Sequence, residues 1–519
     1  MLEKIDLNQA MDKQAYKTEL PALEKRLASL QEQIKDMKIP VIIAFEGWSA
    51  SGKGTMIGRI VYPLDPRFFN VYTMSKINED AAMRPFLWNY WIKTPESGLI
   101  AIFDKSWHRL ILPNLTAQFG EHGQIAKRLL KPDKKPAAGP GPRLLNEAEA
   151  AGFYQDVNSF EKHLADDGAL IIKLFLHIGK DEQRKRFREL EKNPDTAWRV
   201  AVRDWEQNRN YEEYVKLYSE ILSQTGAGER SWSIVEANDR KFATVKTYKV
   251  IIKRIEDEIY RRQQAEKHAE REQDPALKPP GVSILSGVDL SKTVVNAEYK
   301  KEIAFLQGRI AELGYKLYAK RRSVAIAYEG WDAAGKGGNI KRVTEHLDPR
   351  AYEVIPVGVP TQEELSHHYL WRFYNKFPKD GHIAIFDRSW YGRVLVERVE
   401  ELTPPEVWRR AYREINDMER HLYNHGVILF KFWMHIDPEE QLQRFKAREA
   451  DPLKQYKITG DDWRNRNKWD AYVEAVDEML LRTNTDYAPW TVVESNCKKY
   501  ARVKTLRIIT EELEKRLRG

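Results

Sequence analysis

Cysteine is almost absent from this sequence, since Cys497 is the only one among 519 residues. A single cysteine excludes an intramolecular disulfide framework and a cysteine-rich zinc site, and it is typical of a reducing compartment. No apolar run approaches the ~18 residues that a membrane-spanning helix needs. The opening stretch MLEKIDLNQA also lacks the basic and then apolar layout of a secretory signal. We therefore expect a cytoplasmic protein that does not enter a membrane.

The excess of one charge sign is small. The 85 Lys and Arg residues outnumber the 77 Asp and Glu residues, which gives a net charge of +8 and a pI near 9.0. This excess suits a nucleic acid, a membrane surface or a phosphate-rich substrate as partner, and it suits an evenly charged surface nearly as well. The choice among these partners depends on sequence motifs.

The chain contains two copies of one pattern. AFEGWSASGKGTMI (44–57) is matched by AYEGWDAAGKGGNI (327–340), and the offset of 283 residues is kept as far as Asp104 and Asp387. A chain of 519 residues is too long for one ordinary core. The repeat therefore predicts two related domains.

The domain borders follow from a change in the offset between the copies. WSIVEAN (232–238) matches WTVVESN (490–496) at an offset of 258, so the first half holds 25 extra residues. We place them in a loop that includes KPDKKPAAGPGPR (131–143), because Pro, Gly and Lys are typical of an inserted loop. We predict an N-terminal domain over residues 1–262, a linker over 263–290 and a C-terminal domain over 291–519.

Each half shows the same succession of apolar and helical segments. A helix (about 12–36, and about 296–321) precedes the apolar run VIIAFEG or VAIAYEG, which ends in glycine and leads into another helix. Two more apolar runs follow in the second half, HIAIF before Asp387 and GVILFKFWMHI (426–436). Helical stretches separate the runs, so the strands should be parallel. The expected fold class is α/β, with two tandem P-loop kinase-like domains, each a parallel sheet flanked by helices.

The segment from Gly330 to Lys336 satisfies the phosphate-binding pattern G-x-x-x-x-G-K between a strand and a helix. Its backbone amides would face phosphate oxygens at a helix N-terminus, and Lys336 would add a positive charge. Gly337 stands where a magnesium-binding Ser or Thr is usual, so Asp332 is the candidate that replaces it. The alternative is an incidental glycine-rich turn with a solvated aspartate. We assign these residues to phosphate binding: Gly330, Ala333, Ala334, Gly335 and Gly337.

Two further segments carry charges suited to phosphoryl transfer. In HIAIFDRSWYGRVLVERV (382–399), Asp387 ends an apolar run as a Walker B aspartate does, and Arg388 and Arg393 follow it. For either arginine alone, a surface salt bridge is an equally good interpretation. In GDDWRNRNKWDAY (460–472), the basic residues would close a helical lid over phosphates, or they would line a solvated helical face. These basic residues are Arg464, Arg466 and Lys468.

Together these segments resemble the polyphosphate kinase type 2 family. The resemblance covers nearly all of 296–505 and is carried by YEGWDAAGKGGNIKR, PTQEELSHHYLWRFYNKFPKDGHIAIFDRSWYGRVLVERV and PWTVVESNCKKYARVK. It implies a thymidylate-kinase-like fold, dependence on Mg²⁺ or Mn²⁺, and phosphoryl transfer between inorganic polyphosphate and a nucleotide. It also implies metal ligation by Asp332 and Asp387, and phosphate binding by Lys336, Arg388 and Arg393.

The two-domain form resembles the polyphosphate:AMP phosphotransferase subgroup, which makes ADP from AMP. The resemblance also implies homo-oligomers, and the two halves of one chain could pair instead. Three other functions stay open: an ATP-dependent nucleoside monophosphate kinase, a non-catalytic phosphate or nucleotide sensor, and a nucleic-acid-binding protein. The two P-loop patterns argue against nucleic acid as the partner.

The first half departs from the pattern at reactive positions. Asp104 and Lys53 are retained, whereas Ser49 replaces Asp332. The other replacements are Lys105 for Arg388, His108 for Tyr391, Leu110 for Arg393, Glu206 for Arg464 and Asn208 for Arg466. Loss of these charges predicts a structural or polyphosphate-holding domain. The competing interpretation is that Ser49 supplies a magnesium-binding hydroxyl and the first half acts on another substrate.

Overall fold

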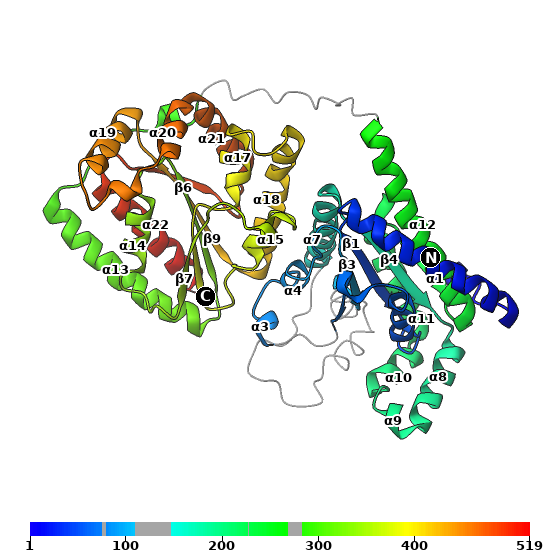
Figure 1. The fold of residues 1–519 in the computed structure, drawn as a ribbon. Coiled ribbons are helices and arrows are strands. Elements are labelled where there is room, and N and C mark those ends of the chain that lie inside the picture. The colour runs from blue at the N-terminus through cyan, green and yellow to red at the C-terminus, as the bar shows by residue number, and fades with distance from the viewer. Residues whose placement is uncertain (75–78, 109–146, 227, 268–282, 519) are drawn as a thin grey trace. The chain divides into compact units, whose positions relative to one another are not determined.

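The computed structural model describes residues 1–74, 79–108, 147–226, 228–267 and 283–518 (Figure 1). The chain divides into two compact units. Unit 1 comprises Met1–Asn78, Asn89–Arg271 and Leu365–His368, and unit 2 comprises Glu79–Trp88, Glu272–Glu364 and Tyr369–Gly519. The loop predicted at 131–143 and the middle of the predicted linker lie outside the described residues.

Each unit contains a five-stranded sheet in which all neighbouring strands are parallel. The strand order is β2-β3-β1-β4-β5 in unit 1 and β7-β8-β6-β9-β10 in unit 2, so the two sheets have the same topology. The strands of unit 1 are β1 (Val41–Gly47), β2 (Phe69–Thr73), β3 (Ile100–Asp104), β4 (Leu170–His177) and β5 (Trp232–Glu236). Those of unit 2 are β6 (Val324–Gly330), β7 (Tyr352–Pro356), β8 (Ile383–Asp387), β9 (Ile428–His435) and β10 (Trp490–Glu494). The predicted α/β class with parallel sheets is confirmed.

The central strands form because their apolar runs are buried on both faces. Every residue of β1, β4 and β9 is buried, as expected for strands covered by helices on both sides. The edge strands were not predicted from the sequence. In β2 (FNVYT) and β7 (YEVIP) most side chains are partly or fully exposed, so these strands lack a continuous apolar run.

Helices flank both sheets (Figure 1). In unit 2, α13, α14 and α22 gather on one side and α17, α18 and α21 on the other (Figure 1). The described helices of the first half are α1 (Lys13–Asp36), α2 (Lys53–Val61), α3 (Glu79–Ala82), α4 (Trp88–Trp91), α7 (Glu147–Asp166), α8 (Lys180–Lys192), α9 (Pro194–Ala197), α10 (Val202–Arg209), α11 (Tyr211–Gln224) and α12 (Arg240–Lys267). Those of the second half are α13 (Asn296–Ala319), α14 (Lys336–Thr344), α15 (Gln362–Leu365), α16 (Trp371–Tyr374), α17 (Val396–Val399), α18 (Pro405–His425), α19 (Pro438–Glu449), α20 (Gly460–Asn467), α21 (Trp469–Thr483) and α22 (Lys498–Arg516). Within the described ranges, no helix is both long and apolar enough to cross a bilayer.

The sheet of unit 2 brings two predicted motifs to one edge. Strands β6 and β8 are neighbours, with Tyr328 paired to Asp387. Since parallel strands end at the same edge of a sheet, the loop after Gly330 and the side chain of Asp387 lie at one place. A short 3-10 helix, η7 (Trp390–Val394), follows β8 at this edge and carries Arg393.

Candidate active site

The phosphate loop of unit 2, Gly330–Lys336, makes a sharp turn between β6 and α14. Gly330 has φ of +146°, and a Cβ at this position would lie 2.5 Å from the carbonyl oxygen of Met434. Gly335 has φ of +106° and directly precedes α14. Both backbone conformations require glycine. The loop therefore ends at a helix N-terminus, whose unpaired amides favour an anion.

The other predicted loop residues lie around this turn. Ala333 has φ of +62°, and Ala333 and Ala334 are both buried. Gly337 lies in the first turn of α14, and a Cβ there would meet no atom within 4 Å. A side chain would therefore fit at Gly337, and the missing Ser or Thr is not explained by crowding within the described structure.

Lys336 lies across the phosphate loop. Its Nζ donates to the carbonyl oxygens of Gly330 at 2.6 Å and Trp331 at 3.2 Å. An ammonium group has three donors, so one is left for a phosphate oxygen. Trp331 in turn donates its indole N–H to Nδ1 of His435 at 3.0 Å. Burial lowers the pKa of His435 to about 4, so this ring is neutral and can accept the bond.

Asp332 is held by two neighbouring elements. Its Oδ2 accepts a hydrogen bond from Asn465 Nδ2 on α20 at 2.9 Å, and its Oδ1 lies 3.4 Å from Nη2 of Arg388. The backbone oxygen of Asp332 accepts from Gln441 Nε2 on α19 at 3.1 Å. The carboxylate is therefore fixed between α20 and the end of β8. Asn465 was not predicted as a site residue, because phosphate binding was assigned to the charged residues on either side of it, Arg464 and Arg466.

Arg388 has a left-handed backbone, with φ of +65°, directly after Asp387. Burial alone would lower the pKa of the Arg388 guanidinium, but nearby carboxylates together raise it by more, so the net shift is upward. These carboxylates are Asp332, Glu329, Asp387 and Asp462. Asp332 and Asp387 thus face the same cation. The structure brings together three of the predicted catalytic residues at one point.

A divalent cation fits this arrangement. Among the described residues, no group of three or more His, Cys, Asp or Glu side chains is arranged to hold a metal ion. Mg²⁺ does not need one, because it is commonly held by one or two carboxylates together with water and substrate phosphates. Asp332 and Asp387 supply two carboxylates beside a phosphate loop, which is the donor set that such a site uses.

A buried carboxyl group links the two motifs. Oε1 of Glu329, next to Gly330, accepts from the amide N–H of Ser389 at 2.8 Å and from its hydroxyl at 2.7 Å. Burial raises the pKa of Glu329 to about 7. Unit 1 repeats this contact, with Glu46 and the amide of Ser106 at 2.6 Å. The contact therefore belongs to the scaffold of both units.

Arg393 contacts groups other than Asp332. Its Nε lies 3.1 Å from Oε2 of Glu397, and its guanidinium carbon lies 4.4 Å from the centre of the Tyr369 ring. Burial raises the pKa of Glu397, and the charge of Arg393 partly offsets that rise. Arg393 thus lies in a second polar cluster at the same sheet edge. Sequence reasoning did not single out Glu397 or Tyr369.

The three basic residues predicted at 460–472 are bound to protein groups. Arg464 Nε and Lys468 Nζ each lie 3.1 Å from Oε2 of Glu400, whose side chain is only 9% exposed. Arg466 donates to the Pro438 carbonyl at 2.7 Å and to Gln441 at 3.1 Å. Glu400 therefore holds Arg464 and Lys468 together, whereas Arg466 braces α20 against α19. Glu400 was missed because nothing in its sequence surroundings marks it.

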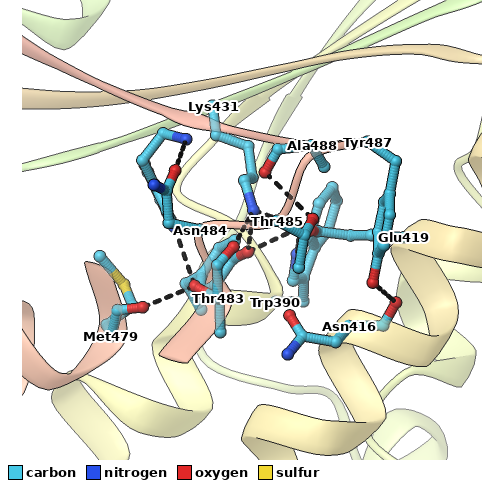
Figure 2. A network of polar contacts seen from close by, with 12 residues as sticks. Trp390, Asn416, Glu419, Lys431, Met479, Thr483, Asn484, Thr485, Tyr487 and Ala488 are labelled. Atoms are coloured by element: carbon cyan, nitrogen blue, oxygen red, sulfur yellow. Dashed lines mark hydrogen bonds and ion pairs between the residues drawn. The ribbon is translucent and has the colours of Figure 1, made fainter. Parts of the chain in front are cut away.

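A network of buried polar contacts connects η7 to the central sheet and to two helices. Lys431 on β9 donates to Oε2 of Glu419 at 2.8 Å and to the carbonyl oxygen of Thr483 at 2.7 Å (Figure 2). Oε1 of Glu419 accepts from the indole of Trp390 at 3.0 Å and from the hydroxyl of Tyr391 at 2.6 Å. Both charged side chains are at most 1% exposed. The network thus joins β9, α18, α21 and the element that carries Arg393.

In unit 1 the equivalent loop makes hydrogen bonds with different groups. The hydroxyl of Ser49 donates to Oδ1 of Asp204 at 2.6 Å, and its amide N–H donates to Oε1 of Gln207 at 3.2 Å. Lys53 Nζ donates to the carbonyl oxygens of Gly47 and Trp48, both at 2.8 Å. The Ser49 hydroxyl and amide are thus both bonded to α10. The loop geometry is kept, but the carboxylate is absent.

Comparisons with known proteins match both halves of the chain to one family. The sequence profile of the polyphosphate kinase 2 family matches residues 10–131, 143–275 and 293–518. Polyphosphate:AMP phosphotransferase from Pseudomonas aeruginosa is 36% identical over 520 residues, covering 99% of each chain, and that from Acinetobacter johnsonii is 31% identical over 499 residues, covering 95% of each. The crystal structure of a putative polyphosphate kinase 2 from Pseudomonas aeruginosa matches with a TM-score of 0.83 at 33% identity and covers 99% of each chain.

Proposed function

Because the chain belongs to the polyphosphate kinase 2 family, we propose that it transfers a phosphoryl group from inorganic polyphosphate to AMP and so forms ADP. The observation that carries the choice of substrates is similarity along 99% of the chain to a protein named polyphosphate:AMP phosphotransferase. We further propose that unit 2 performs the reaction. Its phosphate loop has Asp332 beside Arg388, whereas unit 1 has Ser49 at the equivalent position.

In the proposed mechanism, each group acts on charge or position. The amides at the start of α14 and the free donor of Lys336 bind the terminal phosphates of the donor chain. Asp332 and Asp387 would hold Mg²⁺, which neutralises charge on the phosphates when bound. Arg388 stabilises the charge that builds up in transfer. The nucleotide phosphate oxygen attacks in line, so no covalent enzyme intermediate is needed.

The proposal is tested by the choice of donor. The intact protein is incubated with AMP, Mg²⁺ and either polyphosphate or ATP, and ADP is measured by chromatography. We expect ADP from polyphosphate and none after chelation of the metal. ADP formed only with ATP would instead identify an ATP-dependent nucleoside monophosphate kinase, and binding without turnover would identify a sensor.

A further inference from the structure

Buried polar side chains tie the start of α14 to β6 and α22 in unit 2. Asn339 lies in the first turn of α14 and is 1% exposed. Its Oδ1 accepts from the hydroxyl of Tyr328 on β6 at 3.1 Å. Its Nδ2 donates to the carbonyl oxygen of Ala501 at 3.2 Å and to the hydroxyl oxygen of Thr505 at 3.1 Å, both on α22. We call Tyr328, Asn339 and Thr505 the α14 network.

All donors of the α14 network are used. Both amide hydrogens of Asn339 and the hydroxyl hydrogen of Tyr328 have acceptors, and the hydroxyl of Thr505 donates to the carbonyl oxygen of Ala501 at 2.9 Å. Burial raises the pKa of Tyr328, and the nearby charge of Asp387 raises it further, so this hydroxyl stays protonated. A buried network whose groups are all satisfied holds its elements in one arrangement.

The α14 network reaches both sides of the phosphate loop. On one side, the backbone amide of Asn339 donates to the carbonyl oxygen of Gly335, the last glycine of the loop, at 3.0 Å. On the other side, Tyr328 stands two residues before Gly330 and is paired in the sheet with Asp387. The network therefore connects the amides at the start of α14 to the strand ends that carry Asp387.

Unit 1 lacks the α14 network. At the 283-residue offset, Phe45 and Met56 stand at the positions of the tyrosine and the asparagine, and both belong to the hydrophobic core of unit 1. Only the threonine is kept, as Thr247 at the 258-residue offset. Its hydroxyl is buried and makes no hydrogen bond to any residue that the structure describes. Thr247 has thus kept its side chain without the partner that Thr505 has.

A second contact shows what the fold itself requires at this loop. Arg444 on α19 donates to the carbonyl oxygen of Ala333 at 2.9 Å and so braces the phosphate loop. Unit 1 keeps this bracing arginine, since Arg186 donates to the carbonyl oxygen of Ala50 at 3.1 Å. The brace therefore belongs to the fold of both units, whereas the α14 network occurs only in the unit whose loop has a carboxylate.

Stability alone does not account for the α14 network. A matched apolar pair in place of a hydrogen-bonded pair is often neutral or stabilising, and unit 1 forms the same fold with phenylalanine and methionine. Methionine adapts to the space around it, because its side chain has three rotatable bonds. Hydrogen bonds are directional, so the network adds a defined position and rotation of α14.

We propose that Tyr328 and Asn339 are positioning residues, which hold the start of α14 at a fixed place relative to Asp387 and so align the bound phosphates for transfer. This inference rests on the proposed function, since it concerns the same site of unit 2. Neither side chain needs to touch the substrate, because each acts through the backbone of the phosphate loop. A misplacement of reacting groups by about 1 Å can cost about 10²-fold in rate.

The experiment exchanges the α14 network for the residues of unit 1. Formation of ADP from polyphosphate and AMP is measured for Y328F, N339M and the double variant Y328F/N339M. We expect kcat to fall roughly 10- to 100-fold in N339M, with the KM for AMP within about twofold, because alignment is lost and binding is not. Y328F should lose less, and the double variant should stay within about twofold of N339M, since both changes break one network.

Two controls separate positioning from folding. The urea midpoint of the variants should equal or exceed that of the intact protein, because the same apolar pair is buried in unit 1. The matched variant F45Y/M56N introduces the tyrosine and the asparagine into unit 1. It should leave kcat within about twofold, because the proposed transfer occurs in unit 2.

The positioning role is overturned if Y328F and N339M both keep kcat within about twofold of the intact protein, or if kcat falls only together with the urea midpoint. It is also overturned if F45Y/M56N lowers kcat as much as N339M does, or if the effects of Y328F and N339M multiply in the double variant. If N339M does not fold, Y328F decides alone: an unchanged kcat then refutes the role.

Failure of this inference differs from failure of the proposed function. If the intact protein forms ADP only with ATP, the proposed donor is wrong, and a fall in kcat of that reaction in N339M would still support positioning by the α14 network. If the intact protein forms ADP from polyphosphate and both single variants keep its kcat, the positioning role is wrong and the proposed function stands.

Discussion

Asp332 and Ser49 occupy the same position in two phosphate loops, and Asp332 is bonded to α20 and Ser49 to α10. Asp332 accepts from Asn465, whereas Ser49 donates to Asp204. The direction of the hydrogen bond is thus reversed: the carboxylate that takes part is on the phosphate loop in unit 2 and on α10 in unit 1. A carboxylate on the phosphate loop itself, where it could hold a cation beside bound phosphates, is therefore a feature of unit 2.

Glu329 gives a prediction at the scale of one residue. Burial raises its pKa from 4.5 to about 7, so the native state keeps a proton that the unfolded chain loses between these pH values. The free energy of unfolding of unit 2 should therefore fall as the pH rises from about 4.5 to about 7, by up to ~1.4 kcal/mol per pH unit. Glu329→Gln keeps an acceptor for Ser389 and should remove this contribution.

The measurement is denaturant unfolding of both proteins at several pH values. The free energy of unfolding of E329Q, relative to the intact protein, should rise through this pH window. Parallel pH curves for the two proteins would show that Glu329 does not hold a proton in the native state.

At the scale of elements, the Lys431–Glu419 pair holds β9, α18 and η7 together. Glu419→Ala would leave the ammonium of Lys431 buried without its carboxylate, which typically costs ~3–5 kcal/mol of stability. The double change Lys431→Met with Glu419→Leu removes both charges and should cost less than Glu419→Ala alone. Urea unfolding of the two variants checks this order, and a larger loss in the double variant would contradict it.

Elements differ in how well the sequence predicts them. Strands β6, β8 and β9 were predicted because each is a continuous apolar run buried on both faces. The edge strands β7 and β10 were missed, since a strand that is partly exposed does not need such a run. Helices α1 and α13 agree with the predicted segments to within two residues.

The residues of the candidate site also differ in whether the sequence predicts them. Asp332 and Asp387 were found because a loop pattern and a strand end mark them in the sequence. Glu400 and Asn465 were not, because their roles arise where α20 and α21 fold back on the site. The stacking of Trp469 on Trp331, with ring centres 3.7 Å apart, is likewise set by tertiary contact alone. Local patterns carry no information about such partners.

At the scale of the whole molecule, one fold is present twice with different chemistry. The two sheets share their strand order, and both units keep the loop lysine, the bracing arginine and a buried lysine–glutamate pair, which in unit 1 is Lys173 and Glu161 at 2.7 Å. Unit 1 has Ser49 in place of the loop carboxylate Asp332. Duplication thus kept what stabilises the fold and changed what would act on phosphate.

In the proposed function unit 2 carries out the transfer, and one measurement tests this assignment directly. Formation of ADP from AMP and polyphosphate with Mg²⁺ is followed for the intact protein, Asp332→Asn and Ser49→Asp. We expect Asp332→Asn to lower the rate by about 10³-fold or more, since a metal-holding carboxylate is lost, and Ser49→Asp to leave it within about twofold. Substantial activity in Asp332→Asn would show that unit 1 is a working site and would contradict the assignment.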